Sequence, residues 1–464
     1  MKPSIVYKEV GHLLGKLMYS GSSNGFDRDQ SPEDNEITGR NKFFNAFRSL
    51  KHKNFLMFWF NSCLWDAASW SITLVSTWLT YSITQSAFAT ALVVGLPTIS
   101  SIVISPIIGV LADGMSRKRL LIYISLVQGV VISIFAVLVF IGQISIWYIY
   151  LLVFINGVFA NARSPLRMSI IPNLVPRNFV LNALSLQTVA NSSVRFLLPV
   201  TMGFVIKFFG EGVVLAISAI LYTLSTLFLL KISVEFNKHY HVSAKEIGVE
   251  FLQGVRYLIR EKLLLGTTCL IFIMLFCITA INLSMMPVYS VKVFDAGPEG
   301  AGILVACTGI GITLAGILTS FRTTQDGINH FVMIRLAFAI SIMYIIFSRI
   351  TIFEIGAFNI IISMMLLGMF WLSTEMHIQQ NVDESYRGRV SSLVVSGASV
   401  ALLLGFIFLG YISDLVGVQN ATLLSSLILI ICIVTFLILR QRIFTTSNSA
   451  DEIVGGIREK GIAS

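Results

Sequence analysis

The chain has 464 residues, of which 55% are apolar and 12% are charged, and its mean hydropathy is +0.81. A soluble domain carries about 25% charged residues, so this composition excludes an ordinary water-soluble protein. The five cysteines lie inside apolar runs and form no CxxC pair, so we expect small core residues there in preference to disulfides or metal ligands. A helical membrane protein is the class that remains.

Residues 1–52 are polar and mixed, and we expect a disordered cytoplasmic tail there, or else a start codon assigned too far upstream. Twelve apolar segments follow, each near the roughly 20 residues that span a bilayer. The first six form a unit at 53–231, with segments at 54–82, 86–112, 119–141, 145–165, 181–208 and 212–231. The last six form a unit at 263–440, with segments at 263–290, 299–321, 331–349, 353–380, 389–412 and 418–440. Residues 441–464 are expected to be a second cytoplasmic tail.

The connection at 232–262 separates the two sets of six segments. Within it, Ile247, Phe251, Val255 and Leu258 recur at helical spacing and share one face. This pattern predicts a cytoplasmic linker with an amphipathic helix that lies on the membrane surface.

The basic residues indicate the orientation of the chain. With both termini inside, 29 of the 33 Lys and Arg residues fall in inner segments, three in outer loops, and one, Arg195, within a span. Arg163 and Arg167 are counted among the inner-loop residues. Such an asymmetry predicts a multi-pass protein of the cell inner membrane with cytoplasmic termini. The net charge of +9 then faces anionic lipid, and no nucleic-acid partner is expected.

Charged residues within a span are candidates for function, because burying them in lipid is costly. Asp66 and Glu375 are the acids well inside spans, and Arg195 is the deep cation, so these three are the proton-coupling candidates. Asp66 has two interpretations that stay open: a carboxylate that carries a proton, or a permanent ion pair with Arg195. Glu375 also has alternatives: a proton or substrate site, or else a side chain that reaches the inner surface or pairs with a nearby arginine.

Polar side chains at spacings of three or four predict helix faces that line a central cavity. They lie on the first, fifth, seventh and tenth segments. The substrate-cavity candidates are Ser62, Ser69, Thr73, Gln187, Asn191, Asn282, Met286, Tyr289, Trp371 and Gln379. The methionines of "NLSMMPVYS" suit either an adaptable binding wall or ordinary helix packing.

The segment "GVLADGMSRKRLL" resembles the signature cytoplasmic loop of the major facilitator superfamily through Gly109, Asp113, Arg117 and Lys118. Further segments resemble the drug-proton antiporter branch that includes macrolide efflux proteins and enterobactin exporters: "NARSPLRMSIIPNLVPRNFVLNALSLQ", "FLQGVRYLIREKLLL", "MPVYSVKVFDAGPEGAGILVACTGIGITLAGIL" and "DESYRGRVSSL". The resemblance implies twelve transmembrane helices in two six-helix bundles, a central cavity, a gating loop made by the four signature residues, and alternating access.

The chain departs from the family pattern at four positions, one of which is Asp66, where this branch more commonly has a small polar residue. Gly114 follows the signature aspartate where an arginine is usual, and Leu198 precedes Pro199 where a glycine is usual. Val153 stands where many drug antiporters have an arginine on the fourth helix.

The leading hypothesis is a secondary active transporter that exports an amphipathic small molecule, a siderophore or drug-like compound, by proton antiport. An importer or uniporter on the same fold and a non-transporting membrane sensor are the alternatives. We expect no enzymatic activity, cofactor or metal, since nucleotide-binding and nucleophile motifs are missing from the sequence. The expected partners are a small-molecule substrate, protons and membrane lipids, and the expected state is a monomer.

Overall fold

The computed structural model describes residues 47–114, 116–233, 244–320, 330–384 and 386–438. Every regular element in these ranges is helical, which confirms the predicted all-helical membrane fold. Each of the twelve predicted segments coincides with one helix or, for the seventh, with a run of short helices. Among the described residues, nine helices are long and apolar enough to cross a membrane, and two apolar helices are shorter.

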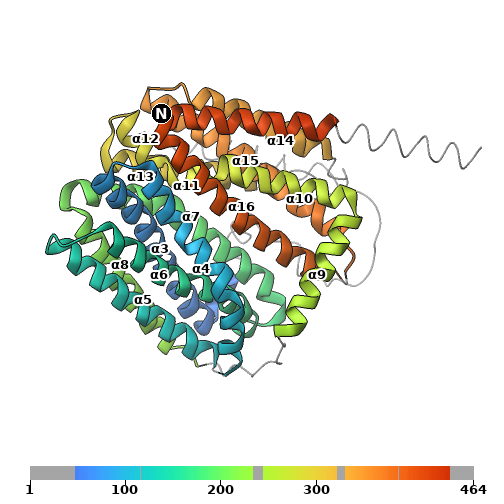
Figure 1. The fold of residues 1–464 in the computed structure, drawn as a ribbon. Coiled ribbons are helices and arrows are strands. Elements are labelled where there is room, and N and C mark those ends of the chain that lie inside the picture. The colour runs from blue at the N-terminus through green and yellow to red at the C-terminus, as the bar shows by residue number, and fades with distance from the viewer. Residues whose placement is uncertain (1–46, 115, 234–243, 321–329, 385, 439–464) are drawn as a thin grey trace, which may run out of the picture. The chain divides into compact units, whose positions relative to one another are not determined.

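Among the described residues, the N-terminal half has six long helices, which Figure 1 draws in blue to green. A short 3-10 turn, η2, precedes them at Arg48–Lys51, and two more, η3 (Ile171–Asn173) and η4 (Arg177–Phe179), join the fourth to the fifth. The long helices are α3 (Lys53–Thr84), α4 (Ala87–Gly114), α5 (Arg117–Phe140), α6 (Ile146–Ile170), α7 (Val180–Phe209) and α8 (Glu211–Leu230). Sharp turns separate them: Gly210, at φ +83°, ends α7 and begins α8, a conformation that glycine adopts without strain.

The C-terminal half begins with a helix that is interrupted twice. A π turn, η5 (Leu275–Thr279), and a break at Met285 divide it. Its pieces are α10 (Lys262–Met274), α11 (Ala280–Ser284) and α12 (Met286–Lys292). The remaining helices, drawn from yellow to red in Figure 1, are α13 (Gly297–Ser320), α14 (His330–Phe347), α15 (Phe353–Asn381), α16 (Arg387–Val416) and the helix Val418–Ile438.

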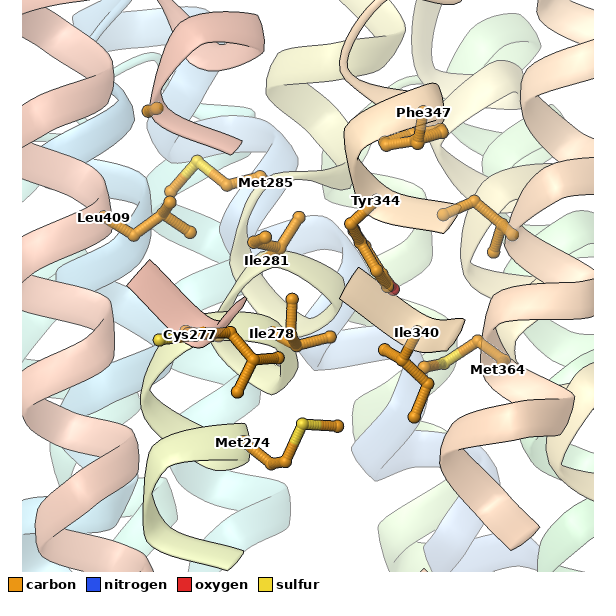
Figure 2. Packing of buried hydrophobic residues seen from close by; sticks show 14 of the residues in the cluster. Met274, Cys277, Ile278, Ile281, Met285, Ile340, Tyr344, Phe347, Met364 and Leu409 are labelled. Carbon is orange, nitrogen blue, oxygen red and sulfur yellow. The ribbon is translucent and has the colours of Figure 1, made fainter. Parts of the chain in front are cut away.

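The core of the C-terminal half is rich in methionine and aromatic side chains. Figure 2 shows Ile278 and Ile281 of the interrupted helix packing toward Ile340 and Tyr344 of α14. Met285, from the Met-rich stretch, is fully buried in the same cluster. The methionines of that stretch therefore fill the core in this state, as unbranched side chains do between irregular helices.

The linker helix α9 (Ala244–Arg260) packs against the C-terminal half. Leu258 is buried and joins a cluster with residues of α10, α15 and α16. A Cβ on Gly254 would lie 3.2 Å from the carbonyl oxygen of Arg389, so α9 approaches the start of α16 closely. Tyr257 stacks on Tyr386 with ring centroids 4.5 Å apart. Part of the apolar face predicted for this helix therefore contacts protein; the side chains of Ile247 and Phe251 lie outside the described residues.

The two halves meet at one end of the helices through a pair of polar contacts. Asp414, near the end of α16, accepts hydrogen bonds from the Ser86 hydroxyl at 2.6 Å and from the Ala87 backbone N–H at 2.7 Å. Lys207, near the end of α7, forms an ion pair with Glu299 at the start of α13. We call the end defined by Ser86, Asp414, Lys207 and Glu299 the latch end. A carboxylate from one half thus caps the positive N-terminus of a helix in the other.

A row of glycines shows how α7 and α13 separate away from the latch end. Gly302, Gly309 and Gly316 are seven residues apart and therefore lie on one face of α13. A Cβ on Gly302 would collide with the Pro199 carbonyl of α7, and one on Gly309 would lie 2.8 Å from the Cβ of Phe196. A Cβ on Gly316 would meet nothing within 4 Å. The two helices are therefore in contact near the latch end and diverge beyond Gly309.

Candidate functional site

A cavity of about 210 Å³ lies among α3, α6 and α7 of the N-terminal half. Its walls carry one acid, two bases and two tryptophans. The lining residues are Trp65, Asp66, Ser69, Trp70, Ala160, Arg163, Arg167 and Asn191. Three sequence-predicted residues, Asp66, Ser69 and Asn191, are therefore brought together here.

Asp66 forms an ion pair in this cavity. Both carboxylate oxygens of Asp66 lie 3.3 Å from Nη1 of Arg167 on α6. The Asp66 side chain is 3% exposed, whereas that of Arg167 is 19% exposed. An acid this deep in a helical bundle needs a counter-charge, and α6 provides it.

Arg163, one turn before Arg167 on α6, is held more firmly. It is 1% exposed, its Nη2 donates to Oδ1 of Asn61 at 2.7 Å, and its Nη1 lies 3.4 Å from the Ser125 hydroxyl. Its guanidinium also lies over the Trp65 ring, 4.6 Å from the centroid. These polar and aromatic contacts come from α3 and α5 and partly replace the water that the cation has lost.

A hydrogen-bonded network fixes the helices around Arg163. The Trp65 indole N–H donates to Gln128 at 2.8 Å, and the Gln128 amide donates in turn to Oδ1 of Asn156 at 3.1 Å. Asn61 donates to the Ser225 carbonyl of α8 at 2.8 Å. Four helices thereby hold the walls of the cavity in one arrangement.

The structure corrects two expectations about the arginines. Arg195 is not the sole deep cation, because α6 continues to Ile170 and brings Arg163 and Arg167 into the bundle. The ion pair of Asp66 is with Arg167 and not with Arg195. The Arg195 guanidinium instead lies over the Trp70 ring, 4.8 Å from the centroid. Val153 lies on the same helix α6, at the position where many drug antiporters have an arginine. Its side chain is buried in the apolar core of the N-terminal half.

A second cavity, of about 230 Å³, lies between α10, α15 and α16 of the C-terminal half. Glu375, Trp371 and Gln379 line it, as the sequence predicted for residues on one face of α15. Glu375 is exposed to this space and makes no ion pair or hydrogen bond with another described residue. It is therefore a carboxylate that water and protons can reach in this state.

The remaining cavity candidates lie elsewhere. Asn282, Met286 and Tyr289 are buried in the C-terminal half, where Tyr344 donates to Asn282 at 2.6 Å and Tyr289 donates to Thr422 at 2.7 Å. They line neither of the two cavities in the part of the chain that the structure describes.

On the N-terminal side, Ser62 and Gln187 are also buried, and their side-chain polar atoms have no described partner. Thr73 is exposed and donates to the Ser69 carbonyl at 3.0 Å.

The gating-loop candidates lie at the end of the helices opposite the latch end. Arg117 donates to the Ser169 carbonyl at 3.1 Å, and Lys118 donates to the Ile232 carbonyl at 2.6 Å. Both cations thus bind carbonyls at the ends of α6 and α8, where the helix dipole favours positive charge. The side chains of Gly109 and Asp113 lie outside the described residues.

Together these features place the sequence-predicted carboxylates in two separate cavities. Two cavities on opposite halves each hold one carboxylate, and both lie in the part of the bundles remote from the latch end. Within the described residues, no group of three or more His, Cys, Asp or Glu side chains could hold a metal ion.

The comparisons with known proteins agree with this architecture. The sequence profile of the transmembrane secretion effectors matches residues 44–454. Macrolide efflux protein A of Streptococcus pyogenes is 23% identical over 338 residues, covering 71% of this chain and 82% of that protein. The staphyloferrin A transporter of Staphylococcus aureus is 23% identical over 317 residues, covering 67% and 77%. The MFS-type transporter YfiS of Bacillus subtilis is 25% identical over 347 residues, covering 71% and 79%.

Solved structures show the same fold. A bacterial homologue of the lysosomal transporter Spinster, in an inward-facing and unoccupied conformation, has a TM-score of 0.67 at 14% identity and covers 85% of this chain and 97% of its own. The nucleoside transporter NupG has a TM-score of 0.64 at 15% identity, covering 84% and 98%. The predicted family is confirmed: the chain is a multi-pass membrane protein that belongs to the transmembrane secretion effectors, a family of major facilitator superfamily transporters.

Proposed function

We propose that this transporter exports an amphipathic small molecule by proton antiport through alternating access. One observation carries the proposal: the halves touch at the latch end and diverge toward the other end, where each presents a carboxylate-bearing cavity. The relatives named for macrolide efflux and for staphyloferrin A transport support an amphipathic substrate.

The orientation follows from the basic residues. With both termini in the cytoplasm, the latch end faces outward and the two cavities face the cytoplasm. The structure then corresponds to an inward-facing state that admits substrate from inside the cell. Export requires the latch to open and the opposite ends to close around the bound molecule.

We assign the coupling proton to Glu375. Antiport requires that proton and substrate favour different states of the protein. Glu375 is accessible and lacks a described counter-ion, whereas Asp66 is buried and ion-paired with Arg167. Asp66 therefore serves as a counter-ion in the N-terminal half, and Arg195 lies beside its cavity without contacting Asp66 in this state.

The test uses inside-out membrane vesicles that are acidified inside by respiration. A pH-sensitive dye reports proton efflux when a macrolide or staphyloferrin A is added, these being the compounds in the relatives' names. We expect substrate-dependent proton efflux in the native protein, loss of efflux in Glu375→Gln, and retained efflux in Asp66→Asn. If efflux is lost in Asp66→Asn and retained in Glu375→Gln, the coupling proton is carried by Asp66 instead.

A uniporter or importer is the second candidate, and the Asp66–Arg167 pair favours it, because one of the two cavity carboxylates already has a counter-ion within the protein. In the same vesicles this candidate predicts that labelled substrate crosses while the lumenal pH stays constant. That result would refute antiport and leave the transporter fold unaffected.

A further inference from the structure

The cavity of the N-terminal half has more positive than negative charge on its walls. Arg163 and Arg167 line it together with a single acid, Asp66. A third cation, Arg195, lies over Trp70, which is itself a lining residue. Cations without a counter-charge are costly to bury in a membrane bundle, so a site with this imbalance favours the binding of an anion.

The arginines also have unused hydrogen-bond donors. The Nε–H groups of Arg163, Arg167 and Arg195 are buried and have no partner among the described residues. Arg167 contacts Asp66 through one nitrogen only, at 3.3 Å to each oxygen. This is longer than the roughly 2.7–2.9 Å of a strong charge-assisted hydrogen bond, and the two-nitrogen edge that guanidinium offers to a carboxylate is not used.

The two lining arginines differ in their freedom. Arg163 is anchored by Asn61 and by the Trp65 ring and is almost fully buried. Arg167 is partly exposed and has Asp66 as its one described side-chain partner. Arg163 therefore supplies a fixed positive field, whereas Arg167 can exchange one carboxylate for another.

The other walls suit an apolar group next to the anion. Trp65 and Trp70 both line the cavity, and each has a guanidinium over one face of its ring. The volume of about 210 Å³ is below the roughly 300–1,000 Å³ of sites that enclose drug-sized ligands. The cavity thus has room for an acidic head and the adjoining ring, while the rest of a larger molecule must extend beyond it.

We propose that this cavity binds the carboxylate of an amphipathic organic anion, with Arg167 exchanging Asp66 for the carboxylate of the substrate. Trp65 and Trp70 contact the apolar group beside that carboxylate. The inference rests on the proposed function, since it names the substrate class of the same transporter.

The experiment measures binding to the full-length protein in lipid nanodiscs. The probes are radiolabelled 2-naphthoate and the neutral 2-naphthamide, which share their rings and differ in the carboxylate. We expect the native protein to bind naphthoate at least about tenfold more tightly than naphthamide. Equal affinities in the native protein would overturn the proposal without the use of any variant.

Two substitutions separate anion binding from structural support. Arg167→Gln should reduce the preference for naphthoate to less than about twofold. Asp66→Asn should raise the affinity for naphthoate about three- to tenfold, because the competing carboxylate is gone. A purely structural ion pair would not give such a gain. Arg177→Gln, which removes an exposed cation that does not line the cavity, is the matched control and should bind both probes as the native protein does.

Other outcomes are equally decisive. Weaker naphthoate binding in Asp66→Asn would refute the exchange, and full displacement of naphthoate by millimolar chloride would identify a site for inorganic anions. The vesicle assay keeps the two proposals apart. Transport of a macrolide or staphyloferrin A without a preference for naphthoate refutes the substrate class alone, whereas that preference without any transport refutes the proposed function alone.

Discussion

The contact between Gly302 and Pro199 predicts that a single methyl group will open the latch end. In Gly302→Ala the new Cβ would collide with the Pro199 carbonyl oxygen and lie 3.3 Å from the Cα of Gly203. Both neighbours are backbone atoms of α7, so neither can turn away as a flexible side chain would. The closed latch end is strained by the substitution, while a state with α7 and α13 apart there is not.

The magnitude follows from the cost of overpacking. An extra methyl group in a well-packed contact costs about 1–3 kcal/mol, and here it does so in one of the two states only. The gain in helix propensity from Gly to Ala, about 1 kcal/mol, applies to both states and cancels. The ratio of latch-open to latch-closed molecules should therefore rise about 5- to 150-fold.

Pulsed electron paramagnetic resonance measures that ratio directly. Spin labels go on Gln143 and Ile352, which are exposed in turns of opposite halves, after the native cysteines have been replaced. The native protein should give mainly the latch-closed distance, and Gly302→Ala should add a longer one. The matched control is Gly316→Ala on the same helix face, where nothing lies within 4 Å and the ratio should change less than about twofold.

Two results would refute this reasoning. One is a distance distribution for Gly302→Ala that matches the native protein. The other is a shift in Gly316→Ala as large as that in Gly302→Ala, which would attribute the effect to helix propensity and not to the contact with α7.

Three further predictions concern single interactions. Asp414→Asn weakens the cap on α4 by about 0.3–1 kcal/mol, so the ratio of latch-open to latch-closed molecules should rise about two- to fivefold. An unchanged distance distribution would contradict this. Lys207→Gln removes a half-exposed ion pair with Glu299 and should change the same equilibrium by less than about 1 kcal/mol; a larger shift would mean that this pair dominates the latch. Tyr344→Phe deletes the hydrogen bond to Asn282 and should lower the free energy of unfolding by about 0.6 kcal/mol, and by at most about 1.7 kcal/mol. Thermal unfolding in detergent measures this loss, and a loss above about 3 kcal/mol would indicate repacking of the core.

The helices were predictable from sequence because each one carries its own signal. A span must satisfy its backbone hydrogen bonds internally and must be apolar along its length, so hydropathy places it within a few residues. The segment predicted at 119–141 is α5, Arg117–Phe140, and the one predicted at 353–380 is α15, Phe353–Asn381. The same periodicity predicted that Glu375 and Trp371 share one face of an unbroken helix, and both line the cavity between α10, α15 and α16.

The arginines of α6 were missed because of a proline. "RSPLR" reads as the end of a helix, since proline removes a backbone donor and disfavours helix in the residue before it. In a membrane bundle a helix can continue through a proline, because neighbouring helices satisfy the backbone groups that the proline leaves unpaired. Helix α6 accordingly continues through Pro165 to Ile170. Arg163 and Arg167 therefore lie inside the protein and not in a loop. An arginine pair four residues apart, on the face of a helix that also carries Asn156, was the available signal.

The faces of the seventh span could not be predicted either. Asn282, Met286 and Tyr289 follow the π turn η5, and Met286 lies beyond a second break at Met285. Each irregularity rotates the residues that follow relative to a continuous α-helix, so a count by 3.6 residues per turn assigns them to the wrong face. Similarly, spacing along one helix cannot reveal which arginine of another helix faces Asp66.

The pairing of Asp66 with Arg167 has a consequence for the biosynthesis of the protein. Helix α3, with Asp66 and its polar neighbours, is not among the described helices that qualify as membrane spans on hydropathy. An aspartate at the centre of a span adds about 2.5–3.5 kcal/mol to its insertion by the translocon. Its partner lies 101 residues later, which a ribosome needs roughly 5 to 20 s to translate. During that interval α3 of the nascent chain is poorly retained in the bilayer, so loss of Arg167 should reduce the yield of protein in which α3 is inserted.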